Sequence, residues 1–345
     1  MGRSRREGSR VRAGRAEAGF DELSPALALE AVEEFAGLRL DGTMSTYPSY
    51  VNRVYGFRTE DGEALVAKFY RPGRWSYEAI LEEHDYMADC VAADIPVVTP
   101  LPGSDGSTLA TLELEGDEGS VEYNFALFPK KGGRNFDAET DADWRRLGAI
   151  AGRLHRVGAA GQARRRQRFD AALVRGWVEE LRSLVHPETR ADFEEGVASA
   201  LEAILPRLET MELQRIHGDL HRGNILERPG EGLLVIDFDD CMNGPPVQDL
   251  WLLLPDRAPN CPRELSLLME GYGDFAVLPR GSMAFIEGLR FLRMLHFLAW
   301  RARQRHDAWF AREFPDWGSK GYWSAEIESL REQSTMLGLD EDPPY

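Results

Sequence analysis

The sequence predicts an α+β fold with a small N-terminal part, built on an antiparallel sheet with a helix, and a larger C-terminal part that is mainly helical. Residues 38–70 alternate apolar and polar side chains on both sides of an Asp61-Gly62 turn, a pattern typical of a β-hairpin. Beyond about residue 135, apolar side chains recur with the period of helices instead. A chain of 345 residues is long enough to build both parts around separate cores.

The chain begins with a segment that lacks the pattern of a folded element. Residues 1–19 contain six arginines among glycines and alanines and almost no large apolar side chain. Such a segment cannot bury enough surface to order itself, so we expect a disordered extension, with an anionic contact or a transit peptide as alternatives. The next run predicts a helix, because Ser24 is a favoured N-cap, Pro25 is favoured at the first helical position and Gly37 is typical of a helix end.

The remaining N-terminal elements are one helix and five strands. An apolar stripe on a helical period predicts the helix over residues 77–93. The strands are predicted from alternating or apolar runs, at 38–43, 51–59, 63–70, 107–115 and 121–129.

The C-terminal part is expected to consist mostly of helices. Residues 142–158 place apolar side chains on one helical face, and we expect His155 beside that face to be a hydrogen-bonded structural residue. Residues 170–212 predict one or two further helices, and 285–306 predicts a deeply packed one. That last helix carries a polar stripe formed by Arg290, Arg293 and His296. The stripe either bridges neighbouring helices or faces an acidic or phosphorylated substrate.

One stretch, residues 214–248, concentrates polar groups around a short hairpin. Apolar runs at 225–226 and 233–236 predict its two strands, and Pro229 and Gly230 lie in the turn between them. The hairpin brings three polar residues to one edge, namely Asp219, Asn224 and Asp237.

These three residues suit phosphoryl transfer, which requires position and charge more than covalent chemistry from the protein. Asp219 is the candidate for the carboxylate that orients the attacking hydroxyl and takes its proton. Mg²⁺ prefers hard oxygen ligands, so Asp237 and the amide oxygen of Asn224 are the candidate metal ligands. The stretch therefore predicts a phosphotransferase active site in which Asp219 and Asp237 are the catalytic residues.

The same stretch resembles the catalytic and metal loops of the protein-kinase-like superfamily. The motif HGDLHRGNIL at 217–226, followed by Asp-Phe-Asp at 237–239, is closer to aminoglycoside phosphotransferase relatives than to eukaryotic protein kinases. Further segments resemble bacterial Ser/Thr protein kinases of this superfamily that act in stress response: SYVNRVYGF (49–57), VAKFYRPGRWS (66–76), ILEEH (80–84), FALFPKKGGRNF (125–136) and NGPPVQDLWLLL (243–254). The resemblance covers roughly residues 20–335 and implies a bilobal protein-kinase-like fold that uses ATP with Mg²⁺.

The resemblance also implies how the chain is divided. The KKGGR turn resembles the hinge between the two lobes. The expected divisions are an extension at 1–19, an N-terminal lobe at 20–129, a hinge at 130–134, a C-terminal lobe at 135–335 and a tail at 336–345.

The resemblance implies three nucleotide-binding residues in the N-terminal lobe. The Gly-rich phosphate loop of protein kinases is absent here, and Ser49 is the matching phosphate-binding position, with an exposed turn serine as the alternative. Lys68, one of only four lysines, suits phosphate oxygens as a compact charge; the alternative is a strand lysine that extends to solvent. The helix glutamate expected to pair with Lys68 is Glu83, and Glu82 stays open as the neighbour.

Other residues of the loops have less specific assignments. The resemblance implies that His217 packs on Phe238, and Asp249 is either an N-cap-like acceptor or the residue that holds the catalytic loop backbone. His221 and Arg222 follow the candidate base directly, and their part in catalysis stays open, since Ser/Thr protein kinases have a lysine at the position of His221. Two roles are open for the aspartate of the metal loop, Asp239: a second carboxylate near Mg²⁺ or a cap of the following turn.

Composition limits the classes of partner. The net charge of −17 opposes general affinity for nucleic acid or anionic membrane, and no apolar run reaches the length of a membrane span. The N-terminus lacks the apolar core of a secretory signal, so we expect a cytoplasmic protein. We expect a monomer rather than an oligomer. Three cysteines without a CxxC pair make a disulfide framework or a zinc site improbable and predict inert thiols, although oxidation of Cys241, next to the metal loop, is an open hypothesis.

Three functions compete at this point. The resemblance favours a Ser/Thr protein kinase that transfers phosphate from MgATP to a protein hydroxyl. The same chemistry would serve a small-molecule kinase acting on an aminoglycoside, a choline-like alcohol or a homoserine-like alcohol. A non-catalytic nucleotide-binding module would be expected to lack at least one member of a set that this chain keeps in full: Lys68, Asp219, Asn224 and Asp237.

Overall fold

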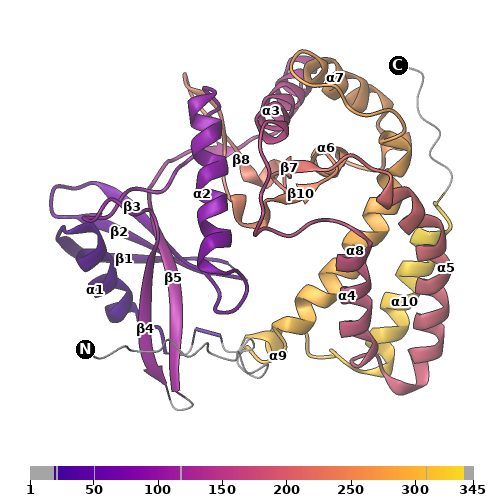
Figure 1. The fold of residues 1–345 in the computed structure, drawn as a ribbon, viewed down its shortest axis with the longest axis horizontal. Coiled ribbons are helices and arrows are strands. Elements are labelled where there is room, and N and C mark those ends of the chain that lie inside the picture. The colour runs from indigo at the N-terminus through magenta and orange to yellow at the C-terminus, as the bar shows by residue number, and fades with distance from the viewer. Residues whose placement is uncertain (1–18, 21, 50, 117–118, 308, 338–345) are drawn as a thin grey trace, which may run out of the picture.

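The computed structural model describes residues 19–20, 22–49, 51–116, 119–307 and 309–337. The predictions for residues 1–18 and 338–345 lie outside these ranges. Within them, the chain forms two parts, a sheet with α1 and α2 and a larger helical body, which lie on opposite sides in Figure 1. The predicted α+β, bilobal kinase-like fold is confirmed.

The N-terminal part is a five-stranded antiparallel sheet in the order β1-β2-β3-β5-β4. Its strands are β1 (Leu40–Tyr47), β2 (Arg53–Thr59), β3 (Ala64–Phe69), β4 (Ala110–Gly116) and β5 (Gly119–Pro129). The helices of this part are α1 (Pro25–Ala36) and α2 (Tyr77–Ala92). α1 starts and ends at the predicted residues: the hydroxyl of Ser24 accepts a bond from the N–H of Leu27, and Gly37 takes the left-handed conformation, with φ 64°.

Aromatic side chains fill the space between α1 and the sheet. They alternate along the strands, so one face of the sheet is apolar, and they include Tyr55, Phe57, Phe69 and Phe125. Phe69 and Phe125 stack with ring centroids 4.8 Å apart. This packing fixes β3 in the middle of the sheet, where its residue Lys68 lies opposite Val54 on one side and Ala126 on the other.

The C-terminal part is mainly helical with two small sheets. Its helices are α3 (Asp141–Ala159), α4 (Ala171–Arg182), α5 (Arg190–Glu209), α6 (Val247–Leu253), α7 (Pro262–Gly273), α8 (Ile286–Arg303), α9 (Phe310–Glu313) and α10 (Lys320–Ser334). Its strands are β6 (Arg134–Asn135), β7 (Gln214–Ile216), β8 (Ile225–Arg228), β9 (Gly232–Val235) and β10 (Met242–Gly244). They form the sheets β6-β8-β9 and β10-β7, and β8 and β9 are the predicted hairpin.

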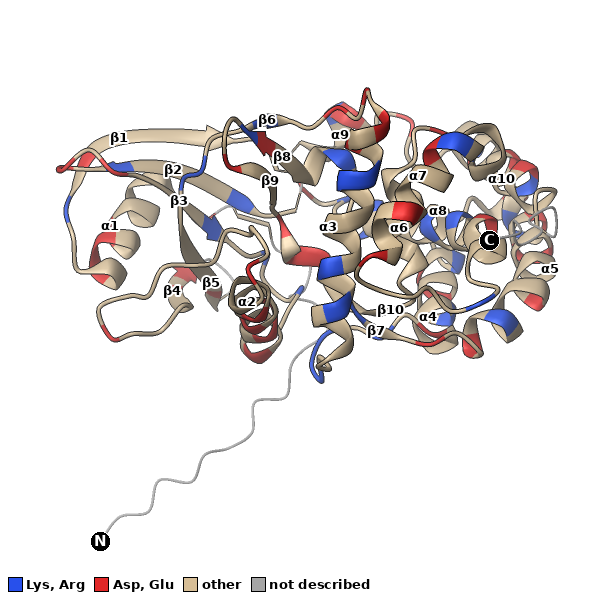
Figure 2. Cartoon of the chain, turned by 90° about the horizontal axis from the view of Figure 1, so that it is seen from above, with Lys and Arg blue, Asp and Glu red and all other residues tan. Residues whose placement is uncertain are grey.

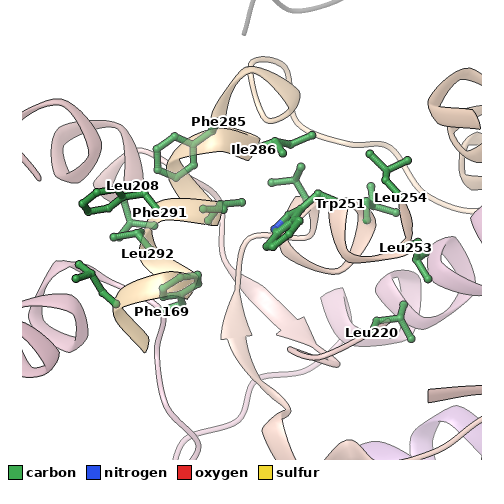
Figure 3. Close-up of a cluster of buried hydrophobic side chains, with 14 of the residues drawn as sticks. Phe169, Leu208, Leu220, Trp251, Leu253, Leu254, Phe285, Ile286, Phe291 and Leu292 are labelled. Atoms are coloured by element: carbon green, nitrogen blue, oxygen red, sulfur yellow. The ribbon is translucent and has the colours of Figure 1, made fainter. Parts of the chain in front are cut away.

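Close packing of α3 against α7 and a continuous core around α6 and α8 hold this part together. A β-carbon on Gly148 of α3 would collide with the carbonyl oxygen of Leu268 on α7, so glycine permits the backbones to approach. Figure 3 shows Trp251 of α6 among neighbouring leucines, with Phe291 and Leu292 of α8 nearby. Phe291 and Leu292 are fully buried, and each such side chain contributes about 1.5–3 kcal/mol.

Ionic contacts join the two parts. Figure 2 shows acidic residues along α2 and basic residues along α3. From the sheet side, Arg71 binds both carboxylate oxygens of Asp307, which follows α8, at 2.9 and 2.5 Å. From α2, Asp89 lies 2.8 Å from Arg215. These contacts fix the surfaces that face each other across the gap between the parts. Within the described ranges, no helix combines the length and apolar content needed to span a bilayer.

Candidate active site

A cavity of about 520 Å³ lies where the two parts meet. It is lined by five of the six predicted site residues: Ser49, Lys68, Glu83, Asp219 and Asp237. The sixth, Asn224, is buried. It lies next to Asp219, since its amide nitrogen donates a hydrogen bond to the Asp219 backbone carbonyl over 2.9 Å. Residues that are up to 188 positions apart in the sequence (237 − 49) therefore border a single cavity.

Lys68 extends from β3 into a group of three carboxylates. Its ammonium nitrogen lies 3.0 Å from Asp239, 3.4 Å from Glu83 and 3.5 Å from Asp237. Burial by itself would lower the pKa of Lys68, but these carboxylates outweigh it and raise that pKa well above its ordinary value. The amine is thus kept charged.

Glu83, and not Glu82, pairs with Lys68. The Glu83 carboxylate is buried and also accepts a bond from the hydroxyl of Tyr70 over 3.2 Å. Its pKa is raised, because burial outweighs the attraction of Lys68. Glu82 instead accepts backbone N–H bonds from residues 164–166, at 2.7 to 3.0 Å. The two neighbours therefore have different partners, although they lie on adjacent faces of α2.

Asp237 stands at the end of β9 in the left-handed conformation, with φ 63° and ψ 68°. For a residue other than glycine this conformation costs about 1–2 kcal/mol. The turn directs the carboxylate toward the cavity, where it is 55% exposed. An accessible oxygen donor at this position suits a metal ligand.

The backbone of the loop before Asp219 is fixed by Asp249. Its carboxylate accepts the N–H groups of His217 and Gly218 over 2.8 and 2.9 Å, and His155 lies 3.1 Å from it. The N-cap alternative for Asp249 is wrong: α6 begins at Val247 and its N-cap is Pro246, so Asp249 lies inside the first turn and points to the core.

Two histidines of this region, His155 and His217, are structural, as expected. His155 bonds Asp249 and the hydroxyl of Tyr272 inside the core. The ring of His217 lies 4.7 Å from that of Phe238, and its Nε2 donates to the carbonyl of Ile236 over 3.0 Å.

The carboxylate of Asp219 faces two basic side chains. Arg293 of α8 donates to its Oδ1 over 2.6 Å, and His221 lies 3.5 Å from its Oδ2. Burial would raise the pKa of Asp219, but the bonds to His221 and Arg293 lower it to about 2. Arg222 turns elsewhere and lies 3.9 Å from Asp137.

Sequence reasoning missed Arg293 as a member of the site. The helical spacing places Arg293 in one stripe with Arg290 and His296, but spacing alone does not show which of these side chains faces the cavity. In the structure, Arg290 contacts Glu287 and Trp251 inside the body, whereas Arg293 and His296 line the cavity.

Asp239 is held by two cations. Besides Lys68 it contacts Arg74, at 2.9 Å, and Arg74 also binds Asp240. Burial would raise the pKa of Asp239, but Arg74, Lys68 and Arg166 lower it well below its usual range. The described contacts therefore make Asp239 an ion-pair partner instead of a turn cap. Arg74 and Arg166 gave no signal in the sequence, because the chain contains 37 arginines (41 − 4 lysines).

Ser49 lies at the mouth of the cavity. Its hydroxyl accepts a bond from the N–H of Asn52 over 3.2 Å and the residue is exposed. This position is compatible with both the phosphate-binding prediction and its alternative.

Comparison with known proteins identifies the family to which the chain belongs. Residues 45–286 match the phosphotransferase enzyme family, a span that contains Lys68, Asp219 and Asp237. The chain belongs to this family of phosphotransferases. Stress response kinase A of Salmonella paratyphi A is 34% identical over 334 residues, covering 94% of this chain and 96% of that protein. The serine/threonine protein kinase RdoA of Salmonella typhimurium matches with the same identity and coverage. The resemblance predicted from the sequence is confirmed.

A solved structure shares the fold. The amicoumacin kinase hAmiN, in complex with AMP-PNP and Ca²⁺, aligns with a TM-score of 0.70 and 19% identity, covering 90% of this chain and 94% of the other. The likeness establishes the architecture of the phosphotransferase.

The part of the cavity formed by the helical body has an aromatic wall. It is formed by residues of the loop before α4, of α4 and of α8: Phe169, Trp177, His296, Phe297 and Trp300. The rings of Trp177 and His296 lie 4.9 Å apart, and burial lowers the pKa of His296 to about 4, so the imidazole is neutral. This side of the cavity therefore carries one guanidinium, that of Arg293, among largely apolar rings.

The residues present fit a metal that arrives with a nucleotide. Among the described residues, no group of three or more His, Cys, Asp or Glu could hold an ion by itself. Asp237 offers a carboxylate, and Asn224 offers its amide oxygen, because its amide nitrogen is used on Asp219. Mg²⁺ usually takes one or two protein oxygens and completes its coordination shell with phosphate and water oxygens. Asp237 and Asn224 offer two such protein oxygens.

The three cysteines are buried and free, as predicted. Burial raises the pKa of Cys241 to about 12, so its thiol is neither accessible nor ionised near neutral pH. These properties argue against oxidation of Cys241 as a control of activity.

Proposed function

We propose that this phosphotransferase is a Ser/Thr protein kinase of stress response, which transfers the γ-phosphoryl group of ATP to a protein hydroxyl in the presence of Mg²⁺. The observation that carries the proposal is the shared cavity that Lys68, Asp219 and Asp237 line. The relative RdoA, at 34% identity over nearly the whole chain, is named a serine/threonine protein kinase, which favours a protein acceptor.

Each side chain has a task in this proposal. Lys68, held by Glu83, binds phosphate oxygens of the nucleotide, and Ser49 contributes a hydroxyl at the cavity mouth. Asn224 and Asp237 would hold Mg²⁺, which when bound would neutralise part of the phosphate charge. Asp219 orients the acceptor hydroxyl, whose position must be in line with the γ-phosphorus.

The transfer forms one bond and breaks one. The acceptor oxygen bonds the γ-phosphorus while the bond from that phosphorus to the bridging oxygen of ADP breaks. The hydroxyl proton passes to a carboxylate oxygen of Asp219. The low pKa of Asp219 keeps this carboxylate ionised and able to orient the hydroxyl across the physiological pH range.

A small-molecule alcohol is the second candidate acceptor. The amicoumacin kinase has the same fold, and the aromatic wall of this cavity could pack against a compact ligand. A panel of protein and small-molecule acceptors separates a protein kinase from a small-molecule kinase.

Purified protein is incubated with [γ-³²P]ATP and Mg²⁺, and with either myelin basic protein or a panel of amino alcohols and aminoglycosides. We expect label on the protein itself or on myelin basic protein, and Asp219→Ala should lower the rate by about 10²–10⁴-fold. The matched control is Asp316→Ala, at an exposed aspartate before α10, with an unchanged rate. Faster labelling of a small alcohol would overturn the protein-kinase assignment, and equal labelling by wild type and Asp219→Ala would overturn the role of the base.

A further inference from the structure

Arg293 is the side chain through which α8 reaches the candidate base. Its Nη2 lies 2.6 Å from Oδ1 of Asp219, and the two side chains are only 18% and 25% exposed. The guanidinium also lies over the ring of Phe297, one helical turn later, 4.8 Å from its centroid. Helix and ring thus restrict the guanidinium to one place.

The contacts of Asp219 divide between its backbone and its carboxylate. The backbone is fixed through Asn224, which donates to its carbonyl, and through Asp249, which holds the two preceding residues. The carboxylate has one close partner among the described contacts, Arg293 at Oδ1, and the more distant His221 beside Oδ2. Rotation of the carboxylate is therefore opposed mainly from α8.

We propose that Arg293 is a positioning residue for phosphoryl transfer, which occupies Oδ1 of Asp219 and so presents Oδ2 to the acceptor hydroxyl. The inference rests on the proposed role of Asp219 as the base. It adds a functional residue from a helix far from both loops in the sequence, since 293 − 219 is 74 positions.

Loss of this contact should affect the transfer step more than nucleotide binding. A displacement of about 1 Å at a reacting group costs about 10²-fold in rate. Arg293 comes from α8 with His296 and Phe297, whereas Lys68 comes from β3 and Ser49 from the loop between β1 and β2. Arg293→Ala should therefore lower kcat about 100-fold and leave KM for ATP within about twofold.

Conservative variants separate charge from geometry. Arg293→Lys keeps the charge but offers a shorter, single-point contact, so an intermediate kcat is expected. Arg293→Gln keeps a hydrogen-bond donor without charge. Added guanidinium ion should restore part of kcat in Arg293→Ala, which a variant damaged only in folding would not show. The matched control is Arg303→Ala on the same helix, whose salt bridge to Glu180 of α4 lies outside the cavity, with unchanged kcat.

A double-mutant cycle with Asp219→Asn tests whether Arg293 acts through Asp219. If it does, Arg293→Ala costs about 100-fold in the wild-type background and less than about threefold in Asp219→Asn. An equal 100-fold loss in both backgrounds would overturn the positioning role and place the guanidinium on the phosphoryl group. Unchanged kcat in folded Arg293→Ala and Arg293→Gln would overturn it as well. Full activity of Asp219→Asn alone would instead refute the proposed function, so the two failures are distinguishable.

Discussion

Lys68 has a structural task besides its proposed contact with phosphate, and the variant Lys68→Met separates the two. Methionine keeps an unbranched side chain, one atom shorter than that of lysine, but removes the charge. It leaves Glu83, 1% exposed, and Asp239, 4% exposed, without the cation that lies between them. An uncompensated buried charge destabilises a protein by about 3–5 kcal/mol.

The remaining cations reduce that cost. Arg74 still contacts Asp239 at 2.9 Å, and Arg166 lies 3.7 Å from Glu83. We therefore expect a loss near the lower end, about 3 kcal/mol, or about 4 °C in Tm for a chain of this size. Phosphoryl transfer should be lost as well.

The second variant of this test is Lys68→Met with Glu83→Gln. It removes the unpaired carboxylate, so more than half of the lost Tm should return while transfer stays absent. Tm is measured by differential scanning calorimetry, and transfer by label from [γ-³²P]ATP. Lys320→Met, at an exposed lysine that contacts Glu188, is the control and should match wild type. A Tm for Lys68→Met equal to wild type, or a double variant no more stable than the single one, would refute the reasoning.

Three further predictions concern the surroundings of the site. Burial lowers the pKa of His84 to about 3, so between about pH 5.5 and about pH 4 the unfolded state binds nearly one proton more than the folded state. Unfolding free energy should therefore fall by about 1.4 kcal/mol for each pH unit by which the pH is lowered in that range through this group, and His84→Gln should flatten the slope by nearly one proton in urea titrations at about pH 4.5, 5 and 5.5. Asp249→Asn weakens the charge-assisted bonds to the catalytic loop backbone, so kcat should fall at least tenfold with the Kd for ATP unchanged; an unchanged kcat would contradict the loop-holding role. Cys241→Ser should respond to peroxide as wild type does, because the thiol is buried with a pKa of about 12, and selective protection of the variant's kinase activity would revive control by oxidation.

Local signals in the sequence are sufficient to predict most of the helices and strands. Capping residues fixed both ends of α1, and the period of apolar side chains located α2, α3 and α8 within a few residues. Such signals act between neighbours along the chain, so they carry no information on the contacts between the two parts. The ion pair of Arg71 with Asp307, 236 positions apart, could not be predicted from them.

The site residues also fall into two groups, those that motifs in the sequence predict and those whose place depends on tertiary contacts. Lys68, Asp219, Asn224 and Asp237 lie in motifs with fixed spacing, and the structure brings them together. Their roles, the lobe boundaries, the cytoplasmic location and the monomeric state stay predictions. Arg293 belongs to no motif, because its place depends on how α8 packs against the loop, a tertiary relation that periodicity cannot express.

Binding of ATP with and without Mg²⁺ tests the central claim, that Asp237 and Lys68 converge on a metal-bound triphosphate. Isothermal titration calorimetry compares wild type, Asp237→Asn and, as a control, Asp274→Asn at a residue outside the cavity. Wild type should bind ATP tightly only when Mg²⁺ is present, Asp237→Asn should lose that Mg²⁺ dependence, and Asp274→Asn should behave as wild type does. Equal, Mg²⁺-dependent affinity of Asp237→Asn and wild type would contradict the central claim.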